Sequence, residues 1–157
     1  MATRSMIGIM EDDVCKAVYC HWDGYVEHNG VILNKYYTDV KKVNSLIALG
    51  DLSVLGAELG DKHDFNSRNE YLVDAGIETS VATQCTFYGR DREEKNVDFK
   101  TYSNFSEMVS NAKASGCEFV YIMRDGEWFV SSGNMTHILE LKNKLNIIEA
   151  AAEAVEG

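Results

Sequence analysis

A histidine and a carboxylate stand two residues apart in the segment VYCHWDGYVEHNG, residues 18–30. If the chain up to Asp23 forms a strand, His21 and Asp23 point to the same face, because side chains alternate along a strand. A carboxylate beside an imidazole orients or charges it, which suits acid–base catalysis or metal binding. The alternative is structural: the two side chains bond each other and the backbone of the Asp23-Gly24 turn. His21 and Asp23 are therefore the candidate catalytic residues if the protein is an enzyme.

A second charged segment, FYGRDREE at 87–94, carries two arginines that alternate with acidic residues. Guanidinium groups bind phosphate or carboxylate through paired hydrogen bonds, and the neighbouring Tyr88 offers a ring on which a base could stack. Arg4, in the opening TRS, adds a third guanidinium just before the first expected strand. The alternative is a solvated loop whose exposed ion pairs each contribute about 0–1 kcal/mol. Arg90 and Arg92 are thus candidates for holding a phosphate.

Metal-binding and nucleophilic motifs are weak in this sequence. His63 and Asp64 are possible ligands in another segment, but there is no H-E-x-x-H, no C-x-x-C and no calcium-binding loop. No serine lies in a G-x-S-x-G motif. The 4 cysteines lie beside apolar residues, which is typical of buried thiols in a reducing compartment. The sequence therefore predicts neither a metal nor a cofactor.

The net charge of the chain is −10, with 25 acidic and 15 basic residues and a pI near 4.8. Nonspecific binding to nucleic acid needs a basic face that displaces counterions, so this charge argues against direct nucleic-acid binding. No apolar run approaches the roughly 20 residues that span a bilayer, and the first residues do not resemble a secretion signal. We therefore expect a cytoplasmic protein without membrane contact.

Strands are expected where apolar and β-branched residues alternate or cluster. Residues 5–22 predict two strands joined by an acidic turn, and 117–132 predict a hairpin around Asp125-Gly126. A further strand is expected over 79–89.

Helices are expected where apolar residues recur at 3–4 spacing. Two lie between residues 29 and 50, a short one covers 103–114, and GDLSVLG at 50–56 resembles a short capped helix. The same spacing predicts one long C-terminal helix over 135–157, which packs on the sheet or pairs with a second copy of the chain as a homo-oligomer.

These elements predict one α+β domain over 1–157, with a main body at 1–134 and the C-terminal helix at 135–157. The expected architecture is a mainly antiparallel sheet of hairpins with helices packed on it. Without a strand–helix–strand run that carries a glycine phosphate-binding motif, a dinucleotide-binding fold is not expected.

Five motifs in order, TRSMIGI, VYCHWDGY, NGVIL, LIALGDLSVLG and YGRDREE, make the chain resemble a family of short proteins encoded by bacteriophages and prophages. The resemblance covers about residues 3–130. It implies a phage origin, and hence the cytoplasm of a host cell, more than it implies a mechanism, because the family has no settled activity. Glu93 stands where that family has glycine in its charged loop.

The polar motifs lie at the expected ends of strands. If these ends converge, they place arginines, an aromatic face and a carboxylate in one cleft suited to a nucleotide or another small phosphorylated molecule. With the resemblance, this favours a phage binding protein with a counter-defence role, which sequesters a nucleotide signal or blocks a host protein. The candidate ligand-binding residues are Arg4, Ser5, Trp22, Tyr25, Tyr88, Arg90 and Arg92.

Two other functions fit the same sequence. The first is a hydrolase for nucleotides or other phosphoesters, with His21 as general acid–base and Asp23 orienting it. The second is an acidic inhibitor that binds a host nucleic-acid enzyme through its surface charge. The partner is a small phosphorylated ligand for the binding protein and for the hydrolase, and a host protein for the acidic inhibitor.

Overall fold

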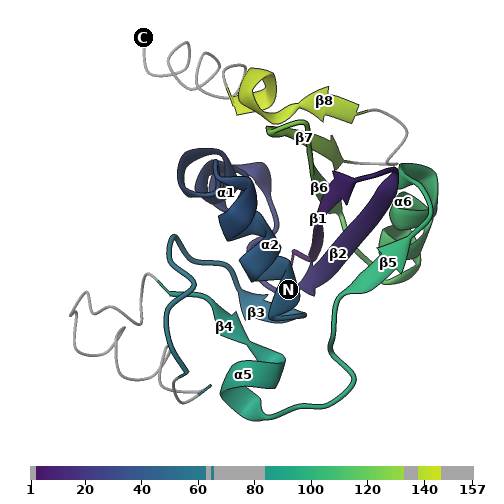
Figure 1. Cartoon of the computed structure of the whole chain (residues 1–157). Coiled ribbons are helices and arrows are strands. Elements are labelled where there is room, and N and C mark those ends of the chain that lie inside the picture. The colour runs from purple at the N-terminus through teal and green to yellow at the C-terminus, as the bar shows by residue number, and fades with distance from the viewer. Residues whose placement is uncertain (1–2, 63–64, 66–83, 133–137, 146–157) are drawn as a thin grey trace, which may run out of the picture.

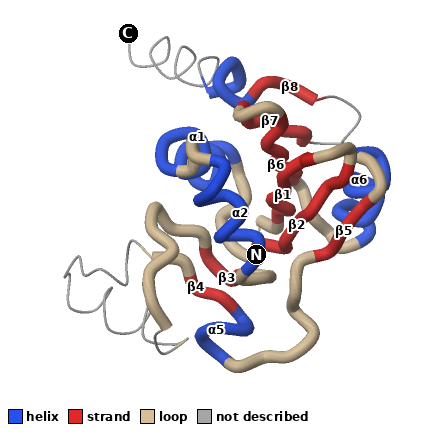
Figure 2. Tube along the Cα trace, viewed as in Figure 1, coloured by secondary structure: helices blue, strands red, loops and turns tan. Residues whose placement is uncertain are grey.

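The computed structural model describes residues 3–62, 65, 84–132 and 138–145. This part of the chain forms one mixed sheet with helices on both faces, which confirms the α+β class (Figures 1 and 2). The strands lie in the order β4-β3-β2-β1-β6-β7-β8, and β5 also pairs with β2. The strands are β1 (Ser5–Glu11), β2 (Val14–Cys20), β3 (Leu52–Val54), β4 (Thr86–Phe87), β5 (Lys100–Tyr102), β6 (Phe119–Arg124), β7 (Glu127–Ser132) and β8 (Ile138–Glu140). The helices are the π-helix η1 (Val26–Gly30), α1 (Val31–Tyr36), α2 (Val40–Ala48), α5 (Tyr88–Arg92) and α6 (Phe105–Ala114).

Both expected hairpins are present. β1 and β2 meet at Asp12-Asp13, and β6 and β7 meet at Asp125-Gly126. The φ angles are 51° and 62° in the first turn and 53° and 80° in the second. Positive φ at both turn residues matches the right-handed twist of the paired strands.

The centre of the sheet differs from the expected row of hairpins. Most strand pairs are antiparallel, but β3 pairs with β2 in parallel at Cys20, and β6 pairs with β1 in parallel, with Ser5 opposite Phe119 and Met10 opposite Arg124. The reason is the path of the chain. Both β5 and β1 are antiparallel to β2, so β5 and β6 run in the same direction and α6 connects them across the sheet. A helical crossover of this kind delivers a parallel strand, and hairpin signals alone do not reveal it.

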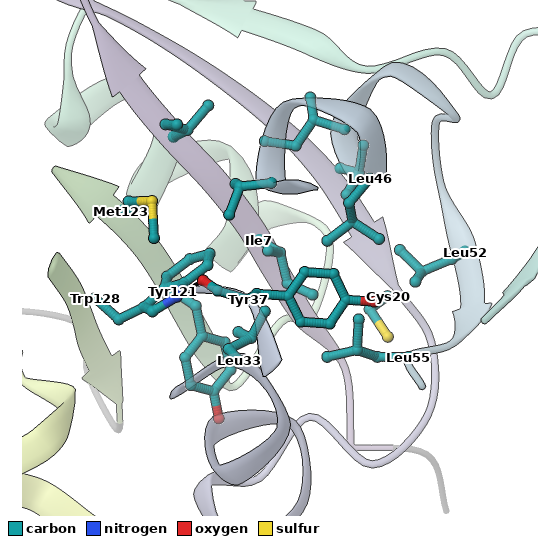
Figure 3. Close-up of a cluster of buried hydrophobic side chains, with 14 of the residues drawn as sticks. Ile7, Cys20, Leu33, Tyr37, Leu46, Leu52, Leu55, Tyr121, Met123 and Trp128 are labelled. Atoms are coloured by element: carbon teal, nitrogen blue, oxygen red, sulfur yellow. Dashed lines mark hydrogen bonds between the residues drawn. The ribbon is translucent and has the colours of Figure 1, made fainter. Parts of the chain in front are cut away.

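Each face of the sheet has its own hydrophobic cluster. On one face α1 and α2 bury Leu33, Tyr37 and Leu46 against β1, β2 and β6 (Figure 3). Tyr37 links this face together, because its hydroxyl donates to the Gly56 carbonyl at 2.7 Å and its own carbonyl accepts from the Trp128 indole at 2.9 Å. On the other face α6 packs Met108 and Ala112 against Met6, Ala17 and Val120.

The two expected helices between residues 29 and 50 are confirmed as α1 and α2, and the helix over 103–114 is confirmed as α6. Asp39 caps α2 by accepting from the Lys41 amide at 3.0 Å, and Asn104 caps α6 by accepting from the Glu107 amide at 2.9 Å. Side-chain acceptors of this kind satisfy amides that have no partner within the helix.

Three local expectations need correction. The segment 50–56 contains strand β3 rather than a helix, because it hydrogen-bonds to the end of β2. The charged segment after Phe87 is helix α5 rather than a loop, so that the strand expected over 79–89 is reduced to β4 within the described residues.

Within the described residues, 138–140 do not form part of the long C-terminal helix expected over 135–157. Residues 138–140 form β8, which pairs with β7, and a helical turn follows at 141–145. An apolar run at 3–4 spacing can also serve as a short edge strand when a neighbouring strand offers free hydrogen-bonding groups. Residues 146–157, on which most of the proposed self-association depends, lie outside the described residues. None of the described helices is long and apolar enough to cross a membrane.

Two glycines with positive φ allow the cost of backbone strain alone to be compared with the cost of strain and a steric collision together. Gly50 and Gly126 have φ angles of +86° and +80°, but an added Cβ would collide with the Val97 carbonyl oxygen at Gly50 and meet nothing within 4 Å at Gly126. We expect Gly126→Ala to lower the free energy of unfolding by about 1 kcal/mol. Gly50→Ala should lower it by roughly 3 kcal/mol. Urea unfolding of both variants tests this, and equal losses would contradict it.

Candidate functional site

The outer edge of β2 is shared by two strands that diverge from each other. β5 pairs with residues 15–17, whereas β3 pairs at Cys20, and backbone bonds continue from the amides of His21 and Trp22 (Figure 1). Between the two strands, the Tyr19 amide donates to Asp51 Oδ1 at 2.9 Å. A carboxylate therefore replaces the missing strand at the point of divergence, which satisfies a backbone donor that would otherwise need water.

A cavity of about 300 Å³ lies at this divergence, on the α6 face of the sheet. Its walls come from β1, β2, β5, the start of β3 and the C-terminal part of α6. The lining is mostly polar, and its residues are Met6, Ala17, Tyr19, Asp51, Lys100, Tyr102, Asn111 and Ser115. We call it the divergence cavity. Its volume is at the lower end of the range for small-molecule sites.

Two cations lie at this cavity without a carboxylate partner in the described part of the chain. Lys100 lines it, and neither Lys100 nor Arg4 forms an ion pair with any described residue. The Arg4 guanidinium lies against the end of α6, where a Cβ added to Gly116 would come within 2.9 Å of Nη1. Gly116 follows Ser115, which lines the cavity, so Arg4 lies beside its mouth. In an acidic protein, such free positive groups are available to an anion.

Tyr19 and His21 form a hydrogen-bonded pair beside Arg4. The Tyr19 hydroxyl lies 2.7 Å from His21 Nδ1. Burial raises the pKa of Tyr19 to about 12, although the nearby Arg4 charge opposes this, so the phenol keeps its proton. Burial and the Arg4 charge both lower the pKa of His21. At neutral pH the pair is therefore uncharged and can exchange hydrogen bonds with a ligand.

Helix α5 brings an aromatic and cationic stack toward Tyr19. The Tyr88 amide donates to the Asp51 carbonyl at 3.2 Å, and burial raises the pKa of the Tyr88 phenol. Arg92 lies 4.8 Å from the Tyr88 ring centroid and 4.6 Å from that of Phe65, and it also pairs with Glu94. Asp51 thus links the two tyrosines, because its carboxylate accepts from the Tyr19 amide and its carbonyl accepts from the Tyr88 amide.

Arg90 is placed differently from the other arginines. Its Nε donates to Asp91 Oδ1, Nη1 to the carbonyls of Leu59 and Gly60, and Nη2 to the Cys85 carbonyl and Asp91 Oδ2. These hydrogen bonds use all five N–H groups that a guanidinium can donate. In this conformation Arg90 ties two segments together and has no donor left for a phosphate.

The Asp-Gly turn at 23–24 has a structural role. The Gly24 amide donates to the Thr3 carbonyl at 2.8 Å, and an added Cβ would lie 2.7 Å from Ser5 Cβ. Asp23 has a φ of 56° and bonds the hydroxyl of Tyr25, so it does not pair with His21. Close approach of the turn to β1 explains why glycine is needed.

Ser5 also faces the interior rather than a cleft. Its hydroxyl accepts from Asn29 Nδ2 at 3.2 Å, and the side chain is fully buried. Trp22 and Tyr25 are the exposed aromatic residues of this segment, at 42% and 38%. Trp22 packs its ring edge-on against His21 with 4.8 Å between centroids.

The structure thus brings Arg4, His21 with Trp22, and Tyr88 with Arg92 toward Tyr19, whereas Arg90, Ser5 and Asp23 are engaged elsewhere. Sequence reasoning missed the cavity residues Tyr19, Asp51 and Lys100. No local sequence pattern marks Asp51 as a site residue, because its carboxylate bonds the Tyr19 amide only where β3 and β5 diverge. Glu93 ends α5 with a φ of 56°, a left-handed conformation that favours glycine.

A second cavity, of about 250 Å³, lies at the opposite edge of the sheet. Its lining includes two carboxylates, which makes it less suited to an anion; the residues are Asn34, Thr38, Gly126, Glu127, Trp128, Glu140 and Lys142. Among the described residues no group of three or more His, Cys, Asp or Glu could hold a metal ion. His63 and Asp64, the possible ligands, lie outside them.

No protein-family model, curated protein or solved structure matches the chain. The assignment of a site therefore depends on the geometry described above.

The saturated guanidinium of Arg90 predicts a large effect on stability. Arg90→Lys removes most of its hydrogen bonds, including two to the buried Asp91 carboxylate, so the free energy of unfolding should fall by roughly 3 kcal/mol. Arg92→Lys is the matched control because Arg92 is exposed, and it should change the value by less than about 0.5 kcal/mol. Denaturant titration measures both. Comparable losses in the two variants would contradict the structural role of Arg90.

The Arg4 charge predicts a measurable shift at His21. Removing it in Arg4→Gln should raise the His21 pKa toward the ordinary value of 6.5, since charge repulsion is one of the two causes of its lowering. NMR titration of the imidazole measures this shift. Lys41→Gln removes a cation from α2 on the other face and should leave the His21 pKa unchanged. A His21 pKa that does not respond to Arg4→Gln would show that the guanidinium lies elsewhere.

Proposed function

We propose that this protein binds a small phosphorylated ligand, such as a nucleotide, in the divergence cavity and does not turn it over. The observation that carries the proposal is the pair of cations at the cavity, Arg4 and Lys100, which have no carboxylate partner among the described residues. The chain carries a net charge of −10, and here two such cations lie at a mostly polar cavity, Lys100 in its lining and Arg4 beside Gly116 and Ser115.

Arg4 is the proposed phosphate-binding residue. Its guanidinium is exposed beside the cavity mouth, next to Ser115, whose hydroxyl can donate to a phosphate oxygen. Arginine suits this role because its planar fork gives two parallel hydrogen bonds to one phosphate. His21 lies within the field of the same guanidinium and can add a third hydrogen bond.

The aromatic residues nearby suit a nucleobase. The Tyr88 amide bonds the carbonyl of the cavity residue Asp51, and Trp22 presents an exposed indole next to His21. Stacking of a base on such rings is typically worth about 1–3 kcal/mol. The Phe65 ring stacks on Tyr88 with 5.6 Å between centroids, and Arg92 also lies over Tyr88, so the exposed Trp22 is the freer ring for a base.

We propose a role in counter-defence, in which the protein sequesters a nucleotide signal of the host cell. This rests on the resemblance to short phage proteins together with the proposed cavity. A binding protein is favoured over a hydrolase because His21 pairs with Tyr19 and Asp23 with Tyr25, so that the expected His21–Asp23 catalytic pair is not formed. The acidic inhibitor of a host enzyme stays a prediction, as no contact in the described residues bears on it.

Isothermal titration with a panel of phosphorylated compounds tests the proposal, together with mass spectrometry of what the purified protein releases on heating. Arg4→Ala and Lys100→Ala should each weaken binding by about 10–100-fold, as expected for the loss of a charged hydrogen bond. Lys41→Ala, on the opposite face, is the matched control and should bind like the unaltered protein.

Two outcomes would overturn the proposal. One is that no phosphorylated compound binds or copurifies. The other is that Arg4→Ala and Lys100→Ala bind as tightly as Lys41→Ala, which would place the ligand away from the divergence cavity. Conversion of a ligand into a product would instead favour the hydrolase.

A further inference from the structure

The divergence cavity is lined by a carboxylate as well as by Lys100, with Arg4 beside its mouth, and this restricts its ligand. Asp51 lines the cavity, and its Oδ1 accepts from the Tyr19 amide. Within the described part of the chain, Oδ2 has no hydrogen-bond donor. A second phosphate placed against this oxygen would be repelled, whereas a hydroxyl or amino donor would be bound.

The fixed orientation of Asp51 makes it a suitable recognition group. Its carboxylate is held at one oxygen by the β2 backbone, and its own amide donates to the Val97 carbonyl at 2.7 Å. Burial raises the pKa of Asp51, and the hydrogen bond from the Tyr19 amide and the Lys100 charge oppose this rise. Lys100 forms no ion pair with Asp51, so its ammonium group, like the Arg4 guanidinium, remains available to a phosphate.

The cavity thus presents groups of both signs, with Asp51 and Lys100 in its lining and Arg4 beside its mouth next to Ser115. We propose that its ligand is a phosphorylated ribose, with the phosphate at Arg4 and the vicinal hydroxyls donating to Asp51 Oδ2. A carboxylate that accepts from ribose hydroxyls is a general means of recognising this sugar. This inference rests on the proposed function, since it names the ligand class of the same cavity.

A free sugar phosphate and a nucleotide both carry a phosphate and vicinal hydroxyls. They differ in the base, which the cavity is too small to hold as well. A volume of about 300 Å³ accommodates a sugar phosphate, so that a base attached to it would extend toward Tyr88. If the natural ligand is a nucleotide, the base adds stacking energy outside the cavity. If it is a sugar phosphate, the ring of Tyr88 contributes nothing.

The experiment compares three probes by isothermal titration: AMP, 2′,3′-dideoxy-AMP and ribose 5-phosphate. We expect AMP to bind about 10–100-fold more tightly than the dideoxy compound, which keeps the phosphate and the base but lacks both hydroxyls. Tighter binding of AMP than of ribose 5-phosphate would identify a nucleotide as the ligand. Equal affinity of these two would identify the sugar phosphate.

Asp51→Asn is the decisive variant, because its side-chain oxygen can still accept from the Tyr19 amide while the second oxygen becomes a donor. Discrimination between AMP and the dideoxy compound should fall to less than about 3-fold, since the charged acceptor of the hydroxyls is lost. Asp125→Asn, the same change in an exposed turn, should keep the full discrimination. Thermal melting of each variant shows whether it is folded.

The outcomes separate this inference from the proposed function. If AMP and dideoxy-AMP bind equally well to the unaltered protein, the phosphate site stands and the recognition of the diol is wrong. The same conclusion follows if folded Asp51→Asn keeps full discrimination. If none of the three probes binds, the diol inference is overturned together with binding of these phosphorylated compounds.

Discussion

The hydrogen bond from the Tyr19 amide to the Asp51 carboxylate is the contact on which the candidate site depends. It stands where β3 and β5 separate along β2, and it allows the sheet to open without leaving a backbone donor unsatisfied. A regular strand in this place would close the gap with ladder hydrogen bonds and leave no cavity. The site therefore exists because the Asp51 carboxylate, rather than another strand, bonds the β2 backbone at Tyr19.

The same opening gathers charge of both signs in a protein that is acidic overall. Arg4 reaches it from the start of β1 and Lys100 from the start of β5, and each is unpaired with any described carboxylate. By contrast, all five N–H groups of Arg90 donate hydrogen bonds to other groups of the protein itself. The number of partners, rather than the residue type, decides which arginine can serve a ligand.

The hairpins and most helices were predictable from sequence because their signals are local. Asp125-Gly126 marks one turn, and the spacing of Val43, Leu46 and Ile47 marks α2. The parallel pairing of β6 with β1 was not predictable, since it depends on a crossover whose partner strand lies far away in sequence. The candidate site was partly predictable: Arg4 and His21 stand out by type, whereas Asp51 gains its role only from two strands that no local pattern places beside it.

The central claim is that a phosphorylated ligand binds where β3 and β5 diverge, and NMR titration of the labelled protein with AMP tests it most directly. Our account predicts that the amide resonances that shift belong to Arg4, Tyr19, Asp51 and Lys100 and to the end of α6 near Ser115. Shifts confined to the second cavity, around Trp128, or no shifts at saturating AMP, would contradict it.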